Sequence, residues 1–128
     1  MTGAYVDASA LAKLILDETH GQAMRRWWIE AESAYTSRIG VVETRRAVAR
    51  WDPNADATFV LRHIAIVEVD PLIAERAATI APPRLRTLDA IHLATALTLG
   101  PEIEAFVTYD DRLADAARAV GLSVVRPA

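Results

Sequence analysis

Short apolar segments alternate with longer segments of helical periodicity along the whole chain. The short segments are typical of buried strands, and the periodic segments between them are typical of amphipathic helices. The expected strands cover residues 3–7, 34–36, 64–69, 105–108 and 122–125. The expected helices cover residues 10–16, 22–32, 38–50, 55–63, 71–80, 88–99 and 110–120. This alternation predicts the α/β class, with a mostly parallel central sheet between two helical layers, as in a three-layer α/β/α sandwich.

Polar residues at the segment boundaries predict where the helices begin and end. Ser9, Ser37 and Thr87 are the expected N-caps of three helices. Asp70 and Pro71 have the signature of an N-cap followed by proline at the first helical position. No repeat or linker interrupts the pattern, so we expect residues 1–128 to form one domain.

The composition favours a globular protein and excludes several chemistries. Hydrophobic residues make up 52% of the chain and charged residues 24%, which is a globular balance. The absence of cysteine excludes disulfides, thiol catalysis and cysteine-based zinc sites. No apolar run approaches the roughly 20 residues of a membrane span. A strand-like segment begins so close to the first residue that it leaves no room for a signal peptide. We therefore expect a cytoplasmic protein that does not insert into a membrane.

The net charge of −3 by itself argues against a nucleic-acid-binding protein. The basic residues weaken that argument. All fourteen except Lys13 are arginine, and the guanidinium group of arginine can bind phosphate through two hydrogen bonds. Four metal-bound carboxylates would also change the balance from −3 to +1. The arginines that could contact phosphate are Arg25, Arg26, Arg45, Arg46, Arg84, Arg86 and Arg112, although such residues are commonly solvated surface charges.

Four acidic residues carry the strongest indication of chemistry. Asp7 ends the first expected strand and Asp110 follows the fourth, while Glu43 and Asp89 lie in the first turns of two helices. In an open α/β sheet, functional groups gather beyond the carboxyl ends of the strands. Carboxylates brought together there repel one another unless a cation lies between them. All-oxygen ligands favour Mg²⁺ or Mn²⁺, and such a site is suited to hydrolysis of a phosphate ester.

Each acid also has an ordinary structural explanation. Asp7 can simply cap a helix, Glu43 can pair with Arg46 on a solvated face, and Asp89 can complement a helix dipole. Asp110 competes with the adjacent Asp111, since one of the two can serve only as a cap. Their shared position at one edge of the sheet favours the metal site over four separate explanations.

His92 lies one helical turn after Asp89. It can orient that carboxylate, or it can pack in the helix face without a role in the chemistry. The sequence favours packing.

Four segments resemble the four motifs of PIN-domain ribonucleases, in the same order. They are residues 5–13 (YVDASALAK), 37–43 (SRIGVVE), 85–94 (LRTLDAIHLA) and 106–114 (FVTYDDRLA). The resemblance extends over nearly the whole chain, and the segments are most similar to those of the VapC toxins of bacterial VapBC toxin–antitoxin pairs.

The resemblance implies a PIN-like α/β/α sandwich and endonucleolytic cleavage of RNA that depends on Mg²⁺, with Mn²⁺ as a substitute. It places Asp7, Glu43, Asp89 and Asp110 at the family's acidic positions. It also implies supporting roles for Ser9 and Thr108, and makes Asp111 a water-mediated or substitute ligand. Finally, it implies a homodimer and a cognate VapB-type antitoxin that occupies the toxin's groove.

Other classes of protein fit the residues less well. A signalling receiver domain needs paired acids after the first strand and a lysine after the last strand but one, but here the first strand ends in the single Asp7 and the only lysine is Lys13 in the first helix. A hydrolase with an aspartyl nucleophile needs a second aspartate two residues after Asp7, where the chain has Ser9. A third alternative is a degenerate nuclease fold that serves only as a binding module, and the intact acids argue against it.

Overall fold

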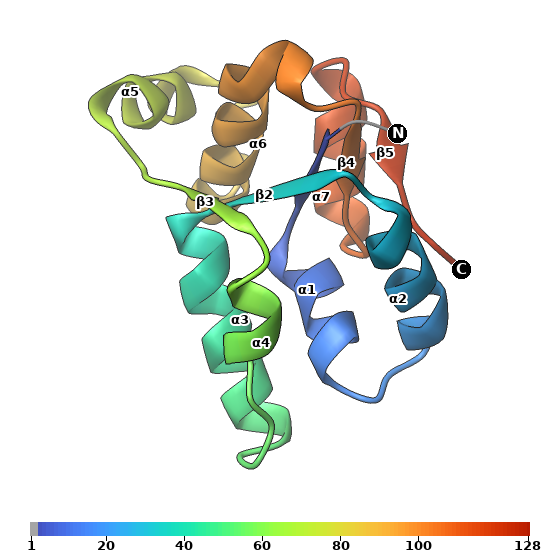
Figure 1. Ribbon diagram of the computed structural model, residues 1–128. Helices are drawn as coiled ribbons and strands as arrows, with labels where there is room; N and C mark the ends of the chain where they lie inside the picture. The colour runs from blue at the N-terminus through green and yellow to red at the C-terminus, as the bar shows by residue number, and fades with distance from the viewer. Residues whose placement is uncertain (1–2) are drawn as a thin grey trace.

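A parallel five-stranded sheet forms the centre of the molecule, as a computed structural model that describes residues 3–128 shows (Figure 1). The strand order is β3-β2-β1-β4-β5, so the first strand lies in the middle. The strands are β1 (Gly3–Val6), β2 (Ser33–Ser37), β3 (Ala65–Val67), β4 (Ala105–Val107) and β5 (Val124–Val125). Every pairing between them is parallel. The predicted α/β class and parallel sheet are confirmed.

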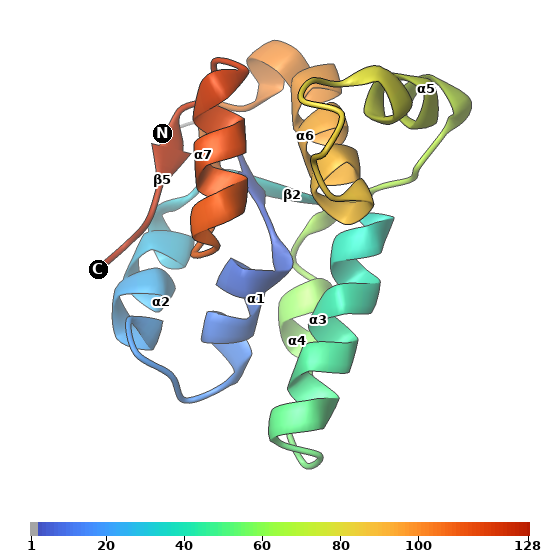
Figure 2. The ribbon, with the colours of Figure 1, turned by 180° about the vertical axis from the view of Figure 1, so that it is seen from behind.

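Helices connect the strands and cover both faces of the sheet. They are α1 (Ala8–Ile15), α2 (Gly21–Glu30), α3 (Arg38–Trp51), α4 (Thr58–Leu61), α5 (Pro71–Thr79), α6 (Thr87–Leu99) and α7 (Asp111–Ala119), with a short 3₁₀ helix η1 (Gly100–Glu102). Viewed from behind, α6 and α7 lie in front of the sheet, and α5 packs on the outer side of α6 (Figure 2). Helices α1 and α2 lie on the other face.

Alternation along the strands explains the two helical layers. In β1, Ala4 and Val6 belong to the apolar cluster that contains Leu11 of α1 and Met24 of α2. Tyr5 points the other way, into a cluster with Phe106, Leu93 and Leu113 from β4, α6 and α7. Successive side chains of a strand face opposite sides of the sheet, so a wholly apolar strand supplies two cores.

The structure corrects several predicted helix ends. Helix α1 begins at Ala8 and is capped by Asp7, not by Ser9. Thr87 is the first residue of α6 and follows Arg86 at the N-cap position, so it is not the cap. The helix predicted over residues 55–63 is only the four-residue α4. The predictions for Ser37 and Asp70 are confirmed, since both side chains accept hydrogen bonds from the first turns of α3 and α5.

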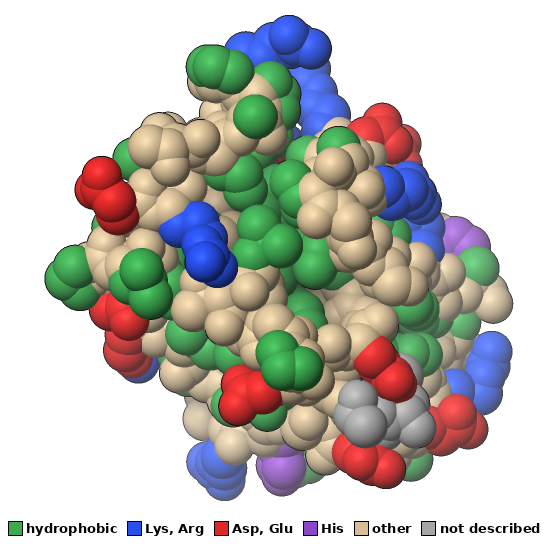
Figure 3. Space-filling view, turned by 90° about the horizontal axis from the view of Figure 1, so that it is seen from above, with side chains coloured by type: hydrophobic (Ala, Val, Ile, Leu, Met, Phe, Trp, Pro, Cys, Tyr) green, Lys and Arg blue, Asp and Glu red, His purple; other side chains and the backbone are tan. Residues whose placement is uncertain are grey.

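Two further observations concern the opposite face of the molecule and the length of its helices. The face at the amino ends of the strands has apolar side chains in its middle and charged side chains mostly around its edge (Figure 3). Among residues 3–128, no helix is both long enough and apolar enough to cross a bilayer.

Candidate acidic active site

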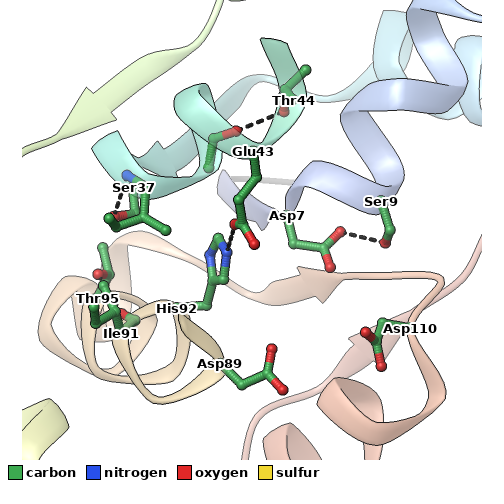
Figure 4. Close-up of polar contacts among 12 residues, drawn as sticks. Asp7, Ser9, Ser37, Glu43, Thr44, Asp89, Ile91, His92, Thr95 and Asp110 are labelled. Atoms are coloured by element: carbon green, nitrogen blue, oxygen red, sulfur yellow. Dashed lines mark hydrogen bonds and ion pairs between the residues drawn. The ribbon is translucent and has the colours of Figure 1, made fainter. Parts of the chain in front are cut away.

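The four predicted acids line one hollow of about 430 Å³ at the carboxyl ends of the strands (Figure 4). Asp7 and Asp110 follow β1 and β4, which are neighbours in the sheet. Glu43 reaches the hollow from the second turn of α3, and Asp89 from the first turn of α6. Residues that are 103 positions apart in the sequence (7 and 110) therefore share one site. The predicted convergence of these carboxylates is found in the structure.

Asp7 is buried and held by three hydrogen bonds from neutral donors. Thr108 Oγ1 donates to Asp7 Oδ2 at 2.6 Å, and Ser9 Oγ donates to Oδ1 at 2.7 Å. The backbone N–H of Ala10 donates to Oδ1 at 3.0 Å, which is the N-cap bond of α1. Burial raises the pKa of Asp7, and the hydrogen bonds from Thr108 and Ser9 partly offset this effect. Asp7 therefore caps a helix and lies in the hollow at once, so the two explanations do not compete.

Ser9 and Thr108 also connect the start of α1 to the end of β4. Ser9 Oγ accepts a hydrogen bond from the backbone N–H of Tyr109 at 2.9 Å. Thr108 Oγ1 accepts one from the backbone N–H of Asp110 at 3.0 Å. The two hydroxyl groups therefore fix the Asp7 carboxylate relative to both strand ends, in keeping with the supporting position expected for them.

Glu43 is held by a histidine that the sequence did not connect to it. His92 Nε2 lies 2.5 Å from Glu43 Oε1, and His92 Nδ1 lies 2.5 Å from the hydroxyl oxygen of Tyr5. His92 is only 1% exposed, so the prediction that it packs in the face of its helix is correct as far as it goes. The alternative that it orients Asp89 is wrong, because its partner is Glu43. Their spacing of 49 positions gave no local signal of this contact.

Asp89 and Asp110 are bound by a cation that belongs to the chain itself. Arg86 Nε donates to Asp89 Oδ2 at 2.8 Å, and Arg86 Nη2 donates to Asp110 Oδ2 at 3.2 Å. These hydrogen bonds and charges raise the pKa of the Arg86 guanidinium group. Within residues 3–128, no three acidic or histidine side chains stand close enough together to hold one metal ion in this arrangement. The carboxylates surround the hollow, but Arg86 and His92 take up their hydrogen-bonding positions.

Asp110 and Asp111 have different environments. Asp110 caps α7 through a hydrogen bond from the backbone N–H of Leu113 to Oδ1, and its Oδ2 faces Arg86 at the hollow. Asp111 does not line the hollow. Its side chain is 88% exposed and pairs with Arg126 Nη1 at 2.7 Å. The expectation that one of the two serves only as a cap is wrong, because Asp110 is both the cap and the acid that lines the site. Nothing in the geometry favours Asp111 as a substitute ligand.

Basic residues flank the hollow on two sides. Arg46 and Arg50 line it from the same face of α3 as Glu43, at intervals of three and seven residues. Arg84 and Arg112, together with Arg86, line an adjacent hollow of about 570 Å³ that shares Asp89 with the first. Arginine on both sides of a carboxylate cluster suits a polyanionic ligand that passes across it.

Comparison with known proteins points to one family. The model of the PIN domain matches residues 4–119. Over 129 aligned positions the chain is 36% identical to ribonuclease VapC46 of Mycobacterium tuberculosis strain H37Rv, and the alignment covers 99% of each protein.

Solved structures show the same fold. The crystal structure of M. tuberculosis VapC20, described as a sarcin-ricin-loop-cleaving toxin, has a TM-score of 0.76 at 20% identity and covers 97% of this chain and 99% of that one. A toxin–antitoxin complex from Klebsiella pneumoniae has a TM-score of 0.72 at 21% identity and covers 98% of each chain.

Proposed function

The chain belongs to the PIN domain family and, within it, to the VapC ribonucleases. From this premise we propose that it is a metal-dependent endoribonuclease and the toxin of a type II toxin–antitoxin pair. The observation that carries the proposal is the convergence of Asp7, Glu43, Asp89 and Asp110 on one hollow at the carboxyl ends of β1 and β4.

The donor atoms of the site fit Mg²⁺ or Mn²⁺. All four acidic side chains offer carboxylate oxygens, and no cysteine competes as a softer ligand. Asp7 is 3% exposed and makes no ion pair with any basic side chain within residues 3–128, so a cation beside it would offset the cost of burying its charge. When bound, such an ion supplies activation of a water molecule and stabilisation of charge on a phosphodiester.

The chain's own residues have separate tasks in this proposal. Asp7 and Glu43 are the ligands whose orientation is already fixed, by Ser9 and Thr108 in one case and by His92 in the other. Asp89 and Asp110 complete the ligand set once Arg86 releases them. The side chain of Arg46, on the same hollow, is available to bind the phosphate backbone of RNA.

Two proposals about partners follow from the family. We expect a cognate VapB-type antitoxin to bind this chain, since a structural neighbour is a toxin–antitoxin complex. We also expect a homodimer. A small antitoxin-like reading frame immediately upstream of the gene would identify the antitoxin candidate, and co-expression with it, followed by co-purification and measurement of the mass in solution, tests both expectations.

The direct test of the catalytic proposal uses purified protein and end-labelled single-stranded RNA. We expect cleavage with Mg²⁺ or Mn²⁺ and none with excess EDTA. Asp7→Asn should reduce cleavage to background and remove toxicity in cells, while the fold remains, because asparagine is as good an N-cap as aspartate. Cleavage that persists at the wild-type rate in Asp7→Asn protein would sink this mechanism.

A second candidate function is an RNA-binding or protein-binding module that does no chemistry. The observation that favours this second function is that Arg86 and His92 already form hydrogen bonds with the carboxylates of Asp89 and Glu43. Binding of RNA without cleavage at any concentration of Mg²⁺ or Mn²⁺ would support that alternative.

A further inference from the structure

A continuous hydrogen-bonded chain runs from the end of β2, through the core, to the acidic hollow. The backbone N–H of Ser37 donates to the Tyr5 hydroxyl oxygen at 3.2 Å. That oxygen lies 2.5 Å from His92 Nδ1, and His92 Nε2 lies 2.5 Å from Glu43 Oε1. Figure 4 shows Glu43 between His92 and Asp7. Three segments far apart in sequence, at residue 5, residues 37–43 and residue 92, are thereby connected at one carboxylate.

The direction of each hydrogen bond follows from the atoms available. A tyrosine hydroxyl group carries its proton near neutral pH and can donate one hydrogen bond. Ser37 N–H can only donate, and the short contact of the Tyr5 hydroxyl oxygen with an atom that can accept its proton is the one to His92 Nδ1, at 2.5 Å. A buried hydroxyl proton without an acceptor is costly. His92 therefore carries its proton on Nε2 and donates it to Glu43.

Packing fixes this chain in place. Tyr5 is fully buried and its ring stacks on Phe106, with centroids 5.1 Å apart and planes inclined by 13°. At Gly40, an added Cβ would lie 3.4 Å from His92 Cε1 and 2.3 Å from the Thr36 hydroxyl oxygen. The absence of a side chain there allows α3 to approach β2 and α6, and Glu43 follows less than one helical turn later.

We propose that Tyr5 and His92 are positioning residues that fix Glu43 Oε1 and leave Oε2 directed to a metal ion in the hollow. The inference rests on the metal site of the proposed function and adds to it two residues outside the acidic set. Hydrogen bonds to a ligating carboxylate orient it, and loss of such a bond typically weakens metal binding by about tenfold to a hundredfold.

The tautomer of His92 is the first test, and it does not require metal. In metal-free protein labelled with ¹⁵N at histidine, two-dimensional ¹⁵N–¹H spectra should show His92 as the neutral Nε2–H form. His63 provides an internal contrast, because its Nδ1 lies 2.8 Å from the carbonyl oxygen of Phe59 and must donate there. The His92 signals are assigned by their loss in His92→Gln protein. A proton on His92 Nδ1 would overturn the inference.

The second test compares two tyrosines that pair in register on neighbouring strands, Tyr5 and Tyr35. Tyr5→Phe keeps the stacked ring and removes only the hydroxyl group. We expect it to weaken Mn²⁺ binding by about tenfold in calorimetric titrations and to change the His92 tautomer. Tyr35→Phe should leave both unchanged, because the Tyr35 hydroxyl has no hydrogen-bond partner within residues 3–128.

A double-mutant cycle shows whether Tyr5 acts through His92. In His92→Gln protein the side-chain amide can still donate to Glu43 but no longer depends on Tyr5. Addition of Tyr5→Phe in that background should therefore weaken Mn²⁺ binding by less than about twofold. Additive losses would show that Tyr5 affects the site by a general structural route and would overturn the relay.

The outcomes separate this inference from the proposed function. Absence of Mn²⁺ binding by the wild-type protein would refute the metal site itself. Normal Mn²⁺ binding by Tyr5→Phe protein with an unchanged His92 tautomer would refute only the relay. If Tyr5→Phe protein does not fold, as judged by circular dichroism, the tautomer of His92 in the wild-type protein still decides the matter, because a proton on Nε2 supports the relay and a proton on Nδ1 refutes it.

Discussion

The two halves of the acidic hollow are built on different principles. Asp7 and Glu43 are held by hydrogen-bond partners within the core or at its edge: Thr108, Ser9 and His92. Asp89 and Asp110 are held by Arg86, whose side chain is 52% exposed and comes from a loop. The first half is fixed by buried or partly buried donors that cannot leave without disturbing the fold. The second half is held by a surface cation that can move away.

This difference indicates how a cluster of four carboxylates can exist in a chain without metal. Repulsion among the acids is reduced by Arg86 on the exposed side, and Asp7 on the buried side keeps an elevated pKa. In the proposed metal site, an ion in the hollow would have two ligands already oriented and would have to displace Arg86 from the other two. We expect the carboxylates of the buried half to keep their orientation when a metal ion binds, and those of the exposed half to change theirs.

The largest effect should come from a direct comparison of the two halves. Asp7→Asn should abolish measurable Mn²⁺ binding, whereas Asp110→Asn should weaken it only about tenfold, because Asp110 lies at the solvent edge. Asparagine caps α1 and α7 as aspartate does, so both variants should fold. Titration of each variant with Mn²⁺ measures the difference, with exposed Asp17→Asn as the control. Equal losses at the two positions would contradict the asymmetry.

The buried half should also make the metal-free protein less stable as the pH rises. Because the folded-state pKa of Asp7 is raised, the folded protein retains a proton in the pH range where the unfolded chain has lost it. The free energy of folding that this buried, protonated Asp7 carboxyl group leaves undiminished is therefore fully present below about pH 4, the ordinary aspartate pKa. It is lost as the pH rises through the elevated pKa of the folded state.

Melting curves in EDTA at several pH values test this sign. We expect Asp7→Asn protein to melt a few degrees above wild type at neutral pH and nearly together with it at low pH. Carboxylates with lowered pKa values, such as those of Asp56 and Glu68, have the opposite pH dependence and cancel in this difference. A difference in melting temperature between the two proteins that grows toward low pH would contradict the predicted direction of the pH dependence.

The exposed half should bind metal more tightly when Arg86 is removed. Arg86→Gln frees Asp89 and Asp110, so Mn²⁺ affinity should increase by about two- to fivefold, in keeping with the modest strength of exposed ion pairs. Arg84→Gln is the matched control, since Arg84 lines the adjacent hollow without pairing with either acid. Unchanged affinity in Arg86→Gln protein would mean that Arg86 does not compete with metal.

The smallest effect is expected at Asp111. Asp111→Asn removes an exposed pair with Arg126 and leaves the hollow intact, so cleavage and Mn²⁺ affinity should change by less than about twofold. Parallel cleavage assays of Asp111→Asn and Asp110→Asn proteins distinguish the two neighbours. A larger loss at position 111 than at position 110 would reverse their assignment.

Much of the site could be predicted because its determinants are local. A strand followed by Asp7, and a strand followed by Asp110, place both acids at one edge of a parallel sheet, which needs only periodicity and the geometry of such sheets. The hydroxyl groups of Ser9 and Thr108 were found through the motifs around them. Errors in the helix caps were also local, since Ser9 and Thr87 are good capping residues that lie beside the positions where capping occurs.

The sequence by itself determined the alternation of elements, the parallel sheet and the edge at which the acids meet, because each depends on hydrophobic period and on the chirality of the chain. Only the tertiary structure decided what holds those acids. The contact of Tyr5 with His92 spans 87 positions, and that of Arg86 with Asp110 spans 24. Such contacts depend on how closely α3 and α6 pack and on which rotamers the core allows, and no pattern along the chain records those distances.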